Sequence, residues 1–210
     1  MVAERLMARV GHVGRSTAGS LSGVGNDDAA QCDIVIIAAA WEGCDEVLSP
    51  LTGQLHGKVV VSCVNPLGFD ATGAHRLPTD APSAAEHVAA LLPDCRVVGA
   101  FHHLSASLLL DPAASLAGSE VLVCGDRYEA KAIVRRLCHS LTGRVGIDAG
   151  RLEMARHIEA FTAVLISINK QYGVQSGVAF PQVPALRTIE ATGAMAFGEL
   201  LDVHSTSESA

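Results

Sequence analysis

Polar and aromatic residues follow three short apolar runs of the sequence, close to the point where each run ends. Trp41 follows residues 34–39, Asn65 follows residues 59–64, and a loop rich in histidine and serine follows residues 96–100. Five loop residues are candidate ligand contacts: His102, His103, Leu104, Ser105 and Ala106. If the runs are parallel strands, their carboxyl ends share one edge of a sheet, which is where such sheets bind small molecules. We therefore predict that these seven residues lie around one binding site.

The residue types favour binding and positioning over covalent or metal chemistry. No Ser-His-Asp order, Cys-His pair or metal-spaced cluster stands out, and the six cysteines occur singly, so we interpret them as buried thiols. His102 and His103 are adjacent, and along an extended chain their rings point in opposite directions and cannot chelate one metal together. We therefore predict no metal site and no catalytic side chain.

Structural roles stay open for the same positions. A lone tryptophan after a strand, such as Trp41, is often part of a core or a lid, and Asn65 with the following proline is also a turn signal. The two histidines could simply pack in their loop. Asp126 and Asp148 follow predicted strands, and we expect them to cap helices. Glu159 could face a cofactor cleft or water, and we expect water.

Five β-branched runs alternate with helical segments along the middle of the chain. The runs are residues 34–39, 59–64, 96–100, 121–124 and 144–147. The helical segments are residues 44–55, 83–92 and 128–141, the second with Ser83 as its N-cap. Strand and helix alternating at this spacing predict right-handed βαβ units, and hence a Rossmann-like α/β fold with a mainly parallel, doubly wound sheet.

The pattern changes after residue 148 to one long predicted helix, residues 152–172. It is apolar over so much of its circumference that we expect it to pack on a second copy as well as on its own domain. We divide the chain into an incomplete dinucleotide-binding domain (1–150), a helical dimerisation element (151–180) and a weakly structured tail (181–210) with a short helix near residues 190–201.

Composition limits the classes of function. The chain has 210 residues, 49% of them hydrophobic, which is enough for one sizeable core. A formal charge of −7 without a Lys/Arg run argues against a nucleic-acid surface. No apolar stretch approaches the roughly 20 residues that span a bilayer, and the first 20 residues lack a signal-peptide pattern. We expect a cytoplasmic homodimer whose partners are small molecules, without nucleic acid or membrane.

One part of the predicted fold has no counterpart in the sequence. A doubly wound sheet begins with a central strand, a glycine-rich phosphate loop and a helix, whereas residues 2–10 resemble only the end of a helix. Gly23 and Gly25 start like G-x-G-x-x-G, but Asp28 stands at the third glycine position and no strand precedes them. We therefore favour an N-terminally truncated sheet, from a fragment or an incomplete gene model, over a natural minimal variant.

The order of segments over residues 27–180 resembles the NADPH-dependent F420 reductases. The residues that carry the resemblance are DAAQCDIVIIAAAW ending at Trp41, GKVVVSCVNPL at residues 57–67, VVGAFHHLSA at 97–106, VLVCGD at 121–126 and IDAGRLEMARHIEAFTAVLISIN at 147–169. Any one segment alone is weak, but the ordered set is specific.

The resemblance implies NADP and coenzyme F420, an 8-hydroxy-5-deazaflavin, as cofactors, with direct hydride transfer between nicotinamide and deazaflavin. It places Trp41 beside the dinucleotide, Asn65 at the nicotinamide, and the loop from His102 to Ala106 against both rings. Ala40 and Ser105 stand where the family usually has proline. The family's pyrophosphate loop and its turn for the 2′-phosphate have no match here, so we expect weak NADPH binding by these residues alone.

Two other functions remain open. The chain could be a non-catalytic, truncated remnant that serves as a dimerising or ligand-binding module. It could also be an oxidoreductase that uses another acceptor, such as a flavin or an imine.

Overall fold

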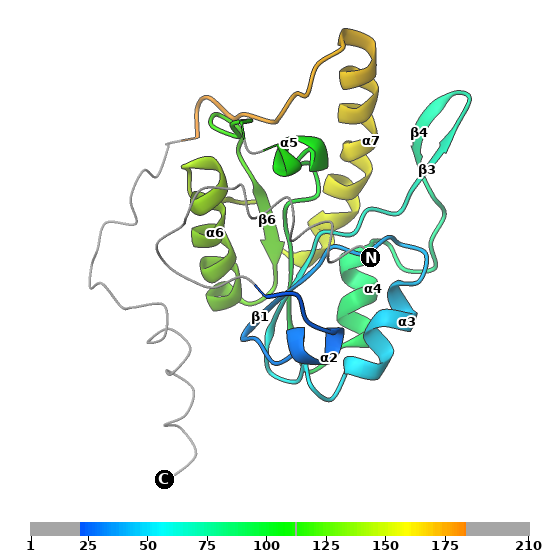
Figure 1. Ribbon diagram of the computed structural model, residues 1–210, viewed down its shortest axis with the longest axis vertical. Coiled ribbons are helices and arrows are strands. Elements are labelled where there is room, and N and C mark those ends of the chain that lie inside the picture. The colour runs from blue at the N-terminus through cyan, green and yellow to red at the C-terminus, as the bar shows by residue number, and fades with distance from the viewer. Residues whose placement is uncertain (1–21, 112, 184–210) are drawn as a thin grey trace.

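A five-stranded sheet forms the centre of the computed structural model, which describes residues 22–111 and 113–183 (Figure 1). The strand order is β1-β2-β5-β6-β7, and neighbours run parallel except β5 and β6, which are antiparallel. The strands are β1 (Ile34–Ile37), β2 (Val59–Ser62), β5 (Arg96–Gly99), β6 (Leu122–Gly125) and β7 (Ile147–Asp148). The predicted α/β class and mainly parallel sheet are confirmed. The helices predicted over residues 2–10 and 190–201 lie outside the described residues.

Helices cover both faces of the sheet (Figure 1). On one face, α6 (Tyr128–Thr142) packs on β5 and β6; on the other, α4 (Ala84–Leu91) packs on β2 and β5 and also contacts α7 (Ala155–Tyr172). The shorter helices are α2 (Asn26–Ala29), α3 (Cys44–Leu48), η1 (Ser49–Leu51), α5 (Ala106–Leu110) and η2 (Leu152–Met154).

The core lies on both sides of β2. Val59, Val60 and Val61 are all completely buried, and successive side chains point to opposite faces. Val60 belongs to the apolar cluster under α3 and α4, while Val59 and Val61 belong to the cluster under α6. A strand buried on both faces is mostly apolar, which is why residues 59–61 lack polar alternation.

Several predicted strands and helices are shorter in the structure, and two of them show the clearest change. The helix expected over residues 44–55 ends as α3 at Leu48 and continues as the 3-10 turn η1. Pro50 lacks the N–H that an α-helix needs there, and its ring would clash with the preceding turn. The strand expected over residues 144–147 is only Ile147–Asp148. At Gly146 a Cβ would lie 2.8 Å from Val123 and 2.9 Å from the Cys138 sulfur, so helix α6 crosses the chain closely at this point.

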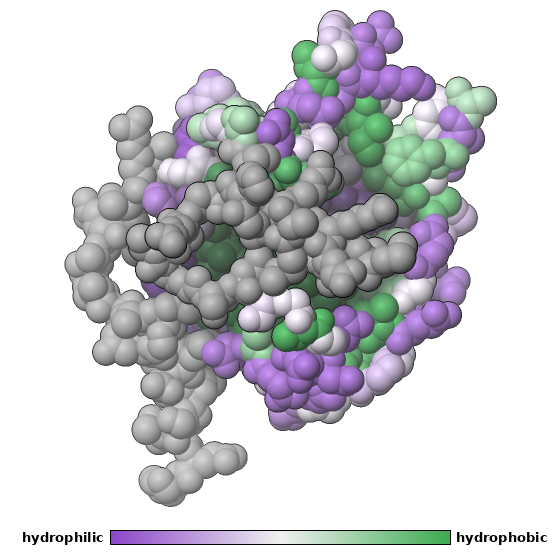
Figure 2. Space-filling model, viewed as in Figure 1, coloured by the Kyte–Doolittle hydropathy of each residue, from purple (hydrophilic) through white to green (hydrophobic). Residues whose placement is uncertain are grey.

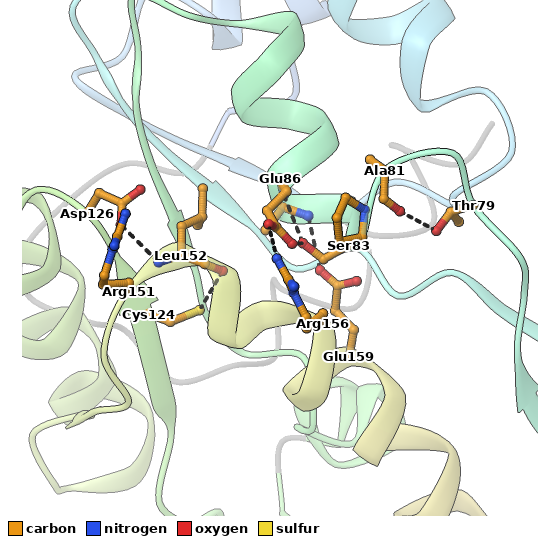
Figure 3. Close-up of polar contacts among 12 residues, drawn as sticks. Thr79, Ala81, Ser83, Glu86, Cys124, Asp126, Arg151, Leu152, Arg156 and Glu159 are labelled. Carbon is orange, nitrogen blue, oxygen red and sulfur yellow. Dashed lines mark hydrogen bonds and ion pairs between the residues drawn. The ribbon is translucent and has the colours of Figure 1, made fainter.

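The predicted cap at Ser83 is confirmed and is reinforced by a buried carboxylate (Figure 3). Ser83 Oγ accepts a hydrogen bond from Glu86 N at 3.0 Å and donates to Glu86 Oε2 at 2.7 Å. The N–H groups of Ala84 and Ala85 donate to the carboxylate of Glu159 at 2.8 and 3.0 Å. The expectation that Glu159 faces water is wrong, because its side chain is completely buried. This burial raises the pKa of Glu159 to about 7.

Two aspartates expected to cap helices act differently. Asp126 Oδ1 accepts from Leu152 N at 3.3 Å, so it contacts the start of η2. Helix α6 has Arg127 as its N-cap residue and receives no side-chain cap from the described residues. Asp148 Oδ1 accepts from Gly150 N at 2.9 Å and pairs with Lys131 at 2.7 Å, so it stabilises a turn. Neither caps the helix predicted from its place after a strand.

The prediction that all six thiols are buried is correct for half of them. Cys44, Cys124 and Cys138 are buried, Cys63 and Cys95 are half-buried, and Cys32 is exposed. All six are free cysteines. Burial raises the pKa of Cys63, Cys124 and Cys138 to about 12, so these thiols stay protonated at neutral pH.

A two-stranded hairpin was not predicted. It consists of β3 (Leu67–Asp70) and β4 (Gly73–Arg76), and it projects from the body of the molecule beside α7 (Figure 1). Residues of β4 contact α7. The hairpin starts five residues after β2 ends, and so it stands at the carboxyl edge of the sheet.

Helix α7 buries one face and exposes an apolar stripe. Ile158, Thr162 and Leu165 point inward. The exposed stripe consists of Phe161, Val164, Ile168 and Tyr172, spaced three or four residues apart. Apolar surface along α7 on the side toward the hairpin is visible in Figure 2. Neither α7 nor any other helix in residues 22–111 and 113–183 is long and apolar enough to cross a membrane.

Candidate functional site

A pocket of about 770 Å³ opens at the carboxyl edge of β1, β2 and β5. All seven predicted site residues line it: Trp41, Asn65, His102, His103, Leu104, Ser105 and Ala106. The hairpin, α7 and the segment after α7 complete the wall, with Glu42, Leu67, Gly68, Phe69, Ser107, Thr162, Leu165, Ile166, Asn169, Gln175 and Ser176 among the lining residues. The volume is in the range of pockets that enclose small-molecule ligands. The structure thus brings the predicted residues together, while their contact with a cofactor stays a prediction.

The loop after β5 is held in a strained conformation. Phe101 has φ of 64°, the only positive value for a residue other than glycine in the described part of the chain. Two side chains clamp the next residue: Asn65 Nδ2 donates to the His102 carbonyl at 2.8 Å, and Thr162 Oγ1 donates to the same oxygen at 3.1 Å. Such strain persists only where the surroundings over-determine the backbone, which is common in ligand-binding loops.

Asn65 has a side-chain oxygen that no described residue contacts by a hydrogen bond. Its Nδ2 is used by the loop, but its Oδ1 is buried and has no hydrogen-bond partner among the described residues. Buried amide oxygens almost always accept a hydrogen bond, because an unmet acceptor costs about 1–3 kcal/mol. An acceptor of this kind on a pocket wall suits an N–H or O–H donor of a bound ligand.

The two histidine rings have different surroundings, although the chain forms a turn at these residues rather than the extended segment that the prediction assumed. The His102 ring lies over β5, where a Cβ added to Gly99 would be 3.1 Å from His102 Nε2, whereas His103 Nε2 bonds the Glu120 carbonyl at 2.8 Å. Burial lowers the pKa of His102 to about 3, and the neighbouring His103 adds to this effect. Burial also lowers the pKa of His103. Both rings are therefore neutral at physiological pH, and the described residues contain no cluster suited to a metal ion.

Trp41 belongs both to the core and to the pocket wall, while its contact with a cofactor stays a prediction. It packs against the apolar cluster under α3 and α4, and it also lines the pocket. Its ring meets the His87 ring edge to face, with centroids 5.2 Å apart, and His87 Nε2 in turn contacts Asp45 Oδ1 at 2.6 Å. His87 of α4 therefore supports the Trp41 ring, and the tryptophan also lines the pocket.

The segment after α7 is part of the site and was not predicted to be. Ser105 Oγ donates to Gln175 Oε1 at 2.7 Å, which joins this segment to the loop after β5. Asn169 Oδ1 accepts from the N–H and the hydroxyl of Ser176 at 2.7 and 2.5 Å. These contacts fix the segment across the mouth of the pocket.

Weak sequence signals could have identified some of the missed residues. Thr162 interrupts the apolar face of the long helix between Ile158 and Leu165, and a hydroxyl at such a position needs a polar partner. Gly173, with φ of 63°, ends the helix and turns the chain back toward the sheet. Gln175 and Ser176 gave no local signal, because their position depends on where this turn leads.

The pocket wall is almost free of charge. Of the described residues that line it, Glu42 is the one carboxylate, no lysine or arginine is present, and the two histidines are neutral. The remaining polar groups are amides and hydroxyls. A wall of this composition suits a planar, mostly uncharged ring system with a few hydrogen-bonding atoms, rather than a phosphate or a carboxylate group.

Comparison with known proteins agrees with this architecture. Residues 1–66 match the model of the family described as NADP oxidoreductase, coenzyme F420-dependent. The F420-dependent NADP reductase of Methanocaldococcus jannaschii is 35% identical over 162 residues, which cover 75% of this chain and 72% of that protein. The corresponding enzyme of Methanothermobacter thermautotrophicus is 30% identical over 171 residues, 79% of this chain and 73% of the relative.

A solved structure shows the same fold. A crystal structure described as an F420-dependent NADP-reductase from an Arthrobacter species superposes with a TM-score of 0.65 at 28% identity, covering 74% of this chain and 72% of that one. The identities, the shared fold and the family match together confirm the resemblance predicted from the sequence. The chain belongs to the F420-dependent NADP reductase family.

Proposed function

We propose that this protein is an oxidoreductase that passes a hydride between NADP(H) and coenzyme F420 in the pocket at the carboxyl edge of the sheet. The observation that carries the proposal is the convergence of all seven predicted residues on that one pocket. The names of the relatives support NADP and F420 as the two cofactors. Bound together, the cofactors would supply the hydride donor and acceptor, nicotinamide C4 and deazaflavin C5, with a proton from solvent completing the reduction.

The residues present fit two stacked rings. The nearly uncharged wall suits ring systems. Asn65 Oδ1, which has no partner in the described part of the chain, suits the N–H donor of a carboxamide or of a deazaflavin. Leu67, Leu165 and Ile166 offer apolar contact from two sides and reduce access of water. A hydride step needs alignment of the rings more than an acid or a base, and the clamped loop at His102 provides a fixed support for such alignment.

Trp41 provides the measurement that tests ligand binding. It is the single tryptophan of the chain and it lines the pocket, so a bound ring should quench its fluorescence. We expect saturable quenching by oxidised F420, and a slow loss of the deazaflavin absorbance when NADPH is added. Titrations with NADPH and with F420 are performed separately, because the two ligands use different parts of the cleft.

A matched pair of variants separates pocket binding from nonspecific quenching. Leu165→Gln changes a residue of the pocket wall, whereas Leu141→Gln changes an exposed leucine of α6 on the far side of the sheet. F420 affinity should fall in the first variant only. Equal affinity for F420 in both variants, or quenching that never saturates with the wild type, would reject the proposal and favour a non-catalytic role.

We further propose that the protein is a homodimer in which α7 packs antiparallel against α7 of a second copy. The exposed stripe of Phe161, Val164 and Ile168 has the spacing of a helix-pairing seam. Exposed Glu153 precedes α7 and exposed Lys170 lies in its last turn, so an antiparallel arrangement brings opposite charges together at both ends. A seam of this kind also removes apolar side chains from water.

The dimer is tested by changing the centre of the stripe. Val164→Glu should shift the molar mass measured by light scattering after size exclusion from dimer to monomer, because two carboxylates would face each other at the twofold axis. Val47→Glu, on the similarly half-exposed valine of α3, serves as the control and should stay dimeric. A wild-type protein that is monomeric at high micromolar concentration would rule the arrangement out.

A further inference from the structure

Glu120 is a buried carboxylate that the hydride reaction does not use. Its side chain is 3% exposed and makes an ion pair with Arg144 at 2.7 Å. The second carboxylate oxygen accepts a hydrogen bond from the backbone N–H of Phe180. A buried charge is tolerated only where its oxygens are engaged, and here the partners come from the turn after α6 and from the segment after α7.

The backbone of Glu120 is bound on both sides as well. Its N–H donates to the Val178 carbonyl at 2.8 Å, and its own carbonyl accepts from His103 Nε2 at 2.8 Å. Because a carbonyl can only accept, His103 must carry its proton on Nε2, and its Nδ1 is an unprotonated, buried atom without a partner among the described residues. Glu120 therefore selects the tautomer and the orientation of a ring that lines the pocket.

The segment that Glu120 holds reaches the pocket wall itself. Residues 174–180 leave α7, cross the mouth of the pocket and end on Glu120, and Gln175 and Ser176 of this segment line the pocket. Gln175 is bonded to Ser105 in the loop that also contains His103. Glu120 thus connects two parts of the pocket wall, the loop after β5 and the segment after α7.

We propose that Glu120 is a positioning residue of the cofactor site: its carboxylate fixes residues 174–180 across the pocket, and its carbonyl fixes the Nε2–H tautomer of His103. The cofactor part of this inference rests on the proposed function, whereas the effect on His103 does not depend on any ligand. Loss of the carboxylate should release the segment after α7 and, through the backbone at residue 120, loosen the His103 ring.

The test uses the full chain with Glu120→Ala and the conservative variant Glu120→Gln. Two-dimensional ¹⁵N NMR of the imidazole groups reports the tautomer of His103, and Trp41 fluorescence reports the dissociation constant for F420. In Glu120→Ala the His103 signal should change to a mixture of tautomers, and F420 affinity should fall about tenfold, the effect of one lost anchoring hydrogen bond. Glu120→Gln still accepts from Phe180 N, so its His103 tautomer and its F420 affinity should stay close to those of the wild type.

Lys131→Met is the matched control, because it breaks the Lys131–Asp148 pair, which has the same 2.7 Å separation but no link to the loop. It should lower thermal stability while leaving the His103 tautomer and F420 affinity unchanged. If Glu120→Ala does not fold, Phe180→Pro removes the N–H donor, together with the phenyl ring, while keeping the carboxylate of Glu120, and should shift both readouts in the same direction. An unchanged tautomer in the folded variants would overturn the proposal; failure of wild-type F420 binding alone would overturn the cofactor assignment instead.

Discussion

At the scale of single residues, the site is defined by polar atoms that serve the fold and the pocket at once. Asn65 clamps the His102 carbonyl with its nitrogen and offers its oxygen to the pocket, and Thr162 supports the same carbonyl from α7. The sequence indicated Asn65 because it directly follows a strand. For Thr162 the only sequence signal is the weak one of a hydroxyl on an apolar helix face, because its partner lies 60 residues away along the chain.

The two donors to His102 allow the clamp and the ligand contact to be measured separately. Thr162→Val removes one donor to the carbonyl and should weaken F420 binding only a few-fold. Asn65→Ala removes the other donor and also the free Oδ1, so its dissociation constant should rise about 10- to 100-fold, as for loss of one or two hydrogen bonds. Trp41 fluorescence titrations give both values. Equal losses in the two variants would show that Asn65 acts through the loop alone.

Glu159 should make stability depend on pH. The pKa of Glu159 is about 7 in the folded protein, compared with an ordinary value of 4.5 that applies to the unfolded chain. Between these two pH values the folded state therefore binds more protons than the unfolded state. The free energy of unfolding should therefore fall as pH rises from about 4.5 to 7, by up to roughly 3 kcal/mol. Urea denaturation at several pH values measures this fall.

Glu159→Gln should remove that part of the pH dependence, since an amide cannot titrate but still accepts from the backbone of α4. Glu153→Gln, on an exposed glutamate of the neighbouring η2, is the control and should behave like the wild type. A Glu159→Gln profile parallel to the wild type between pH 4.5 and 7 would contradict the assignment.

At the scale of secondary structure, elements with a local cause were predictable, whereas elements that depend on distant contacts were not. Ser83 and Glu86 are near each other in sequence, and so the start of α4 was predicted to the residue. The strands of the hairpin have only four residues each and include Gly68, Gly73 and Ala74, so they lack the alternation that marks a strand. Contact with α7 supplies the stability that their sequence does not.

The hairpin depends on its turn, and the turn depends on Asp70. Asp70 Oδ1 accepts from the N–H and the hydroxyl of Thr72 at 2.7 and 2.6 Å and from Gly73 N at 3.2 Å, which also lower the pKa of Asp70. Asp70→Ala should loosen the hairpin and raise the dissociation constant for F420 about threefold, because Phe69 lines the pocket. Melting temperature should change little, since the turn is fully outside the core.

Hydrogen exchange gives an independent measurement of this variant. Amides of the hairpin should exchange faster in Asp70→Ala than in the wild type, while those of β2 and β5 keep their protection. A global loss of protection would mean that the hairpin supports the whole sheet rather than only the pocket.

At the scale of the whole molecule, the sheet has an apolar edge. Among the described residues β1 pairs only with β2, and Ile36 on β1 is 47% exposed. The sequence pattern offers no strand before residues 34–39 that could pair with this edge. It could not predict that β5 and β6 would pair antiparallel, because pairing direction is decided by the path of the chain between them.

An apolar edge of this kind promotes association through strand pairing. Ile36→Lys should therefore reduce light scattering on warming, with a change in unfolding free energy of at most about 0.5 kcal/mol, as is usual for exposed positions. Ile37→Lys is the contrasting variant and should fail to fold, since that neighbouring side chain is only 5% exposed. Scattering that is unchanged in Ile36→Lys would show that the β1 edge is protected.

The segment across the pocket has a consequence for how the protein is made. Gln175 bonds to a serine 70 residues earlier, and Phe180 bonds to a glutamate 60 residues earlier. The described strands and helices all precede Gln175 and Phe180 along the chain. A nascent chain leaving the ribosome can therefore build most of its sheet while the binding site still lacks one wall. We expect ligand-binding competence to be the last property acquired during synthesis, so that a saturating cofactor selectively stabilises chains whose translation has passed this segment.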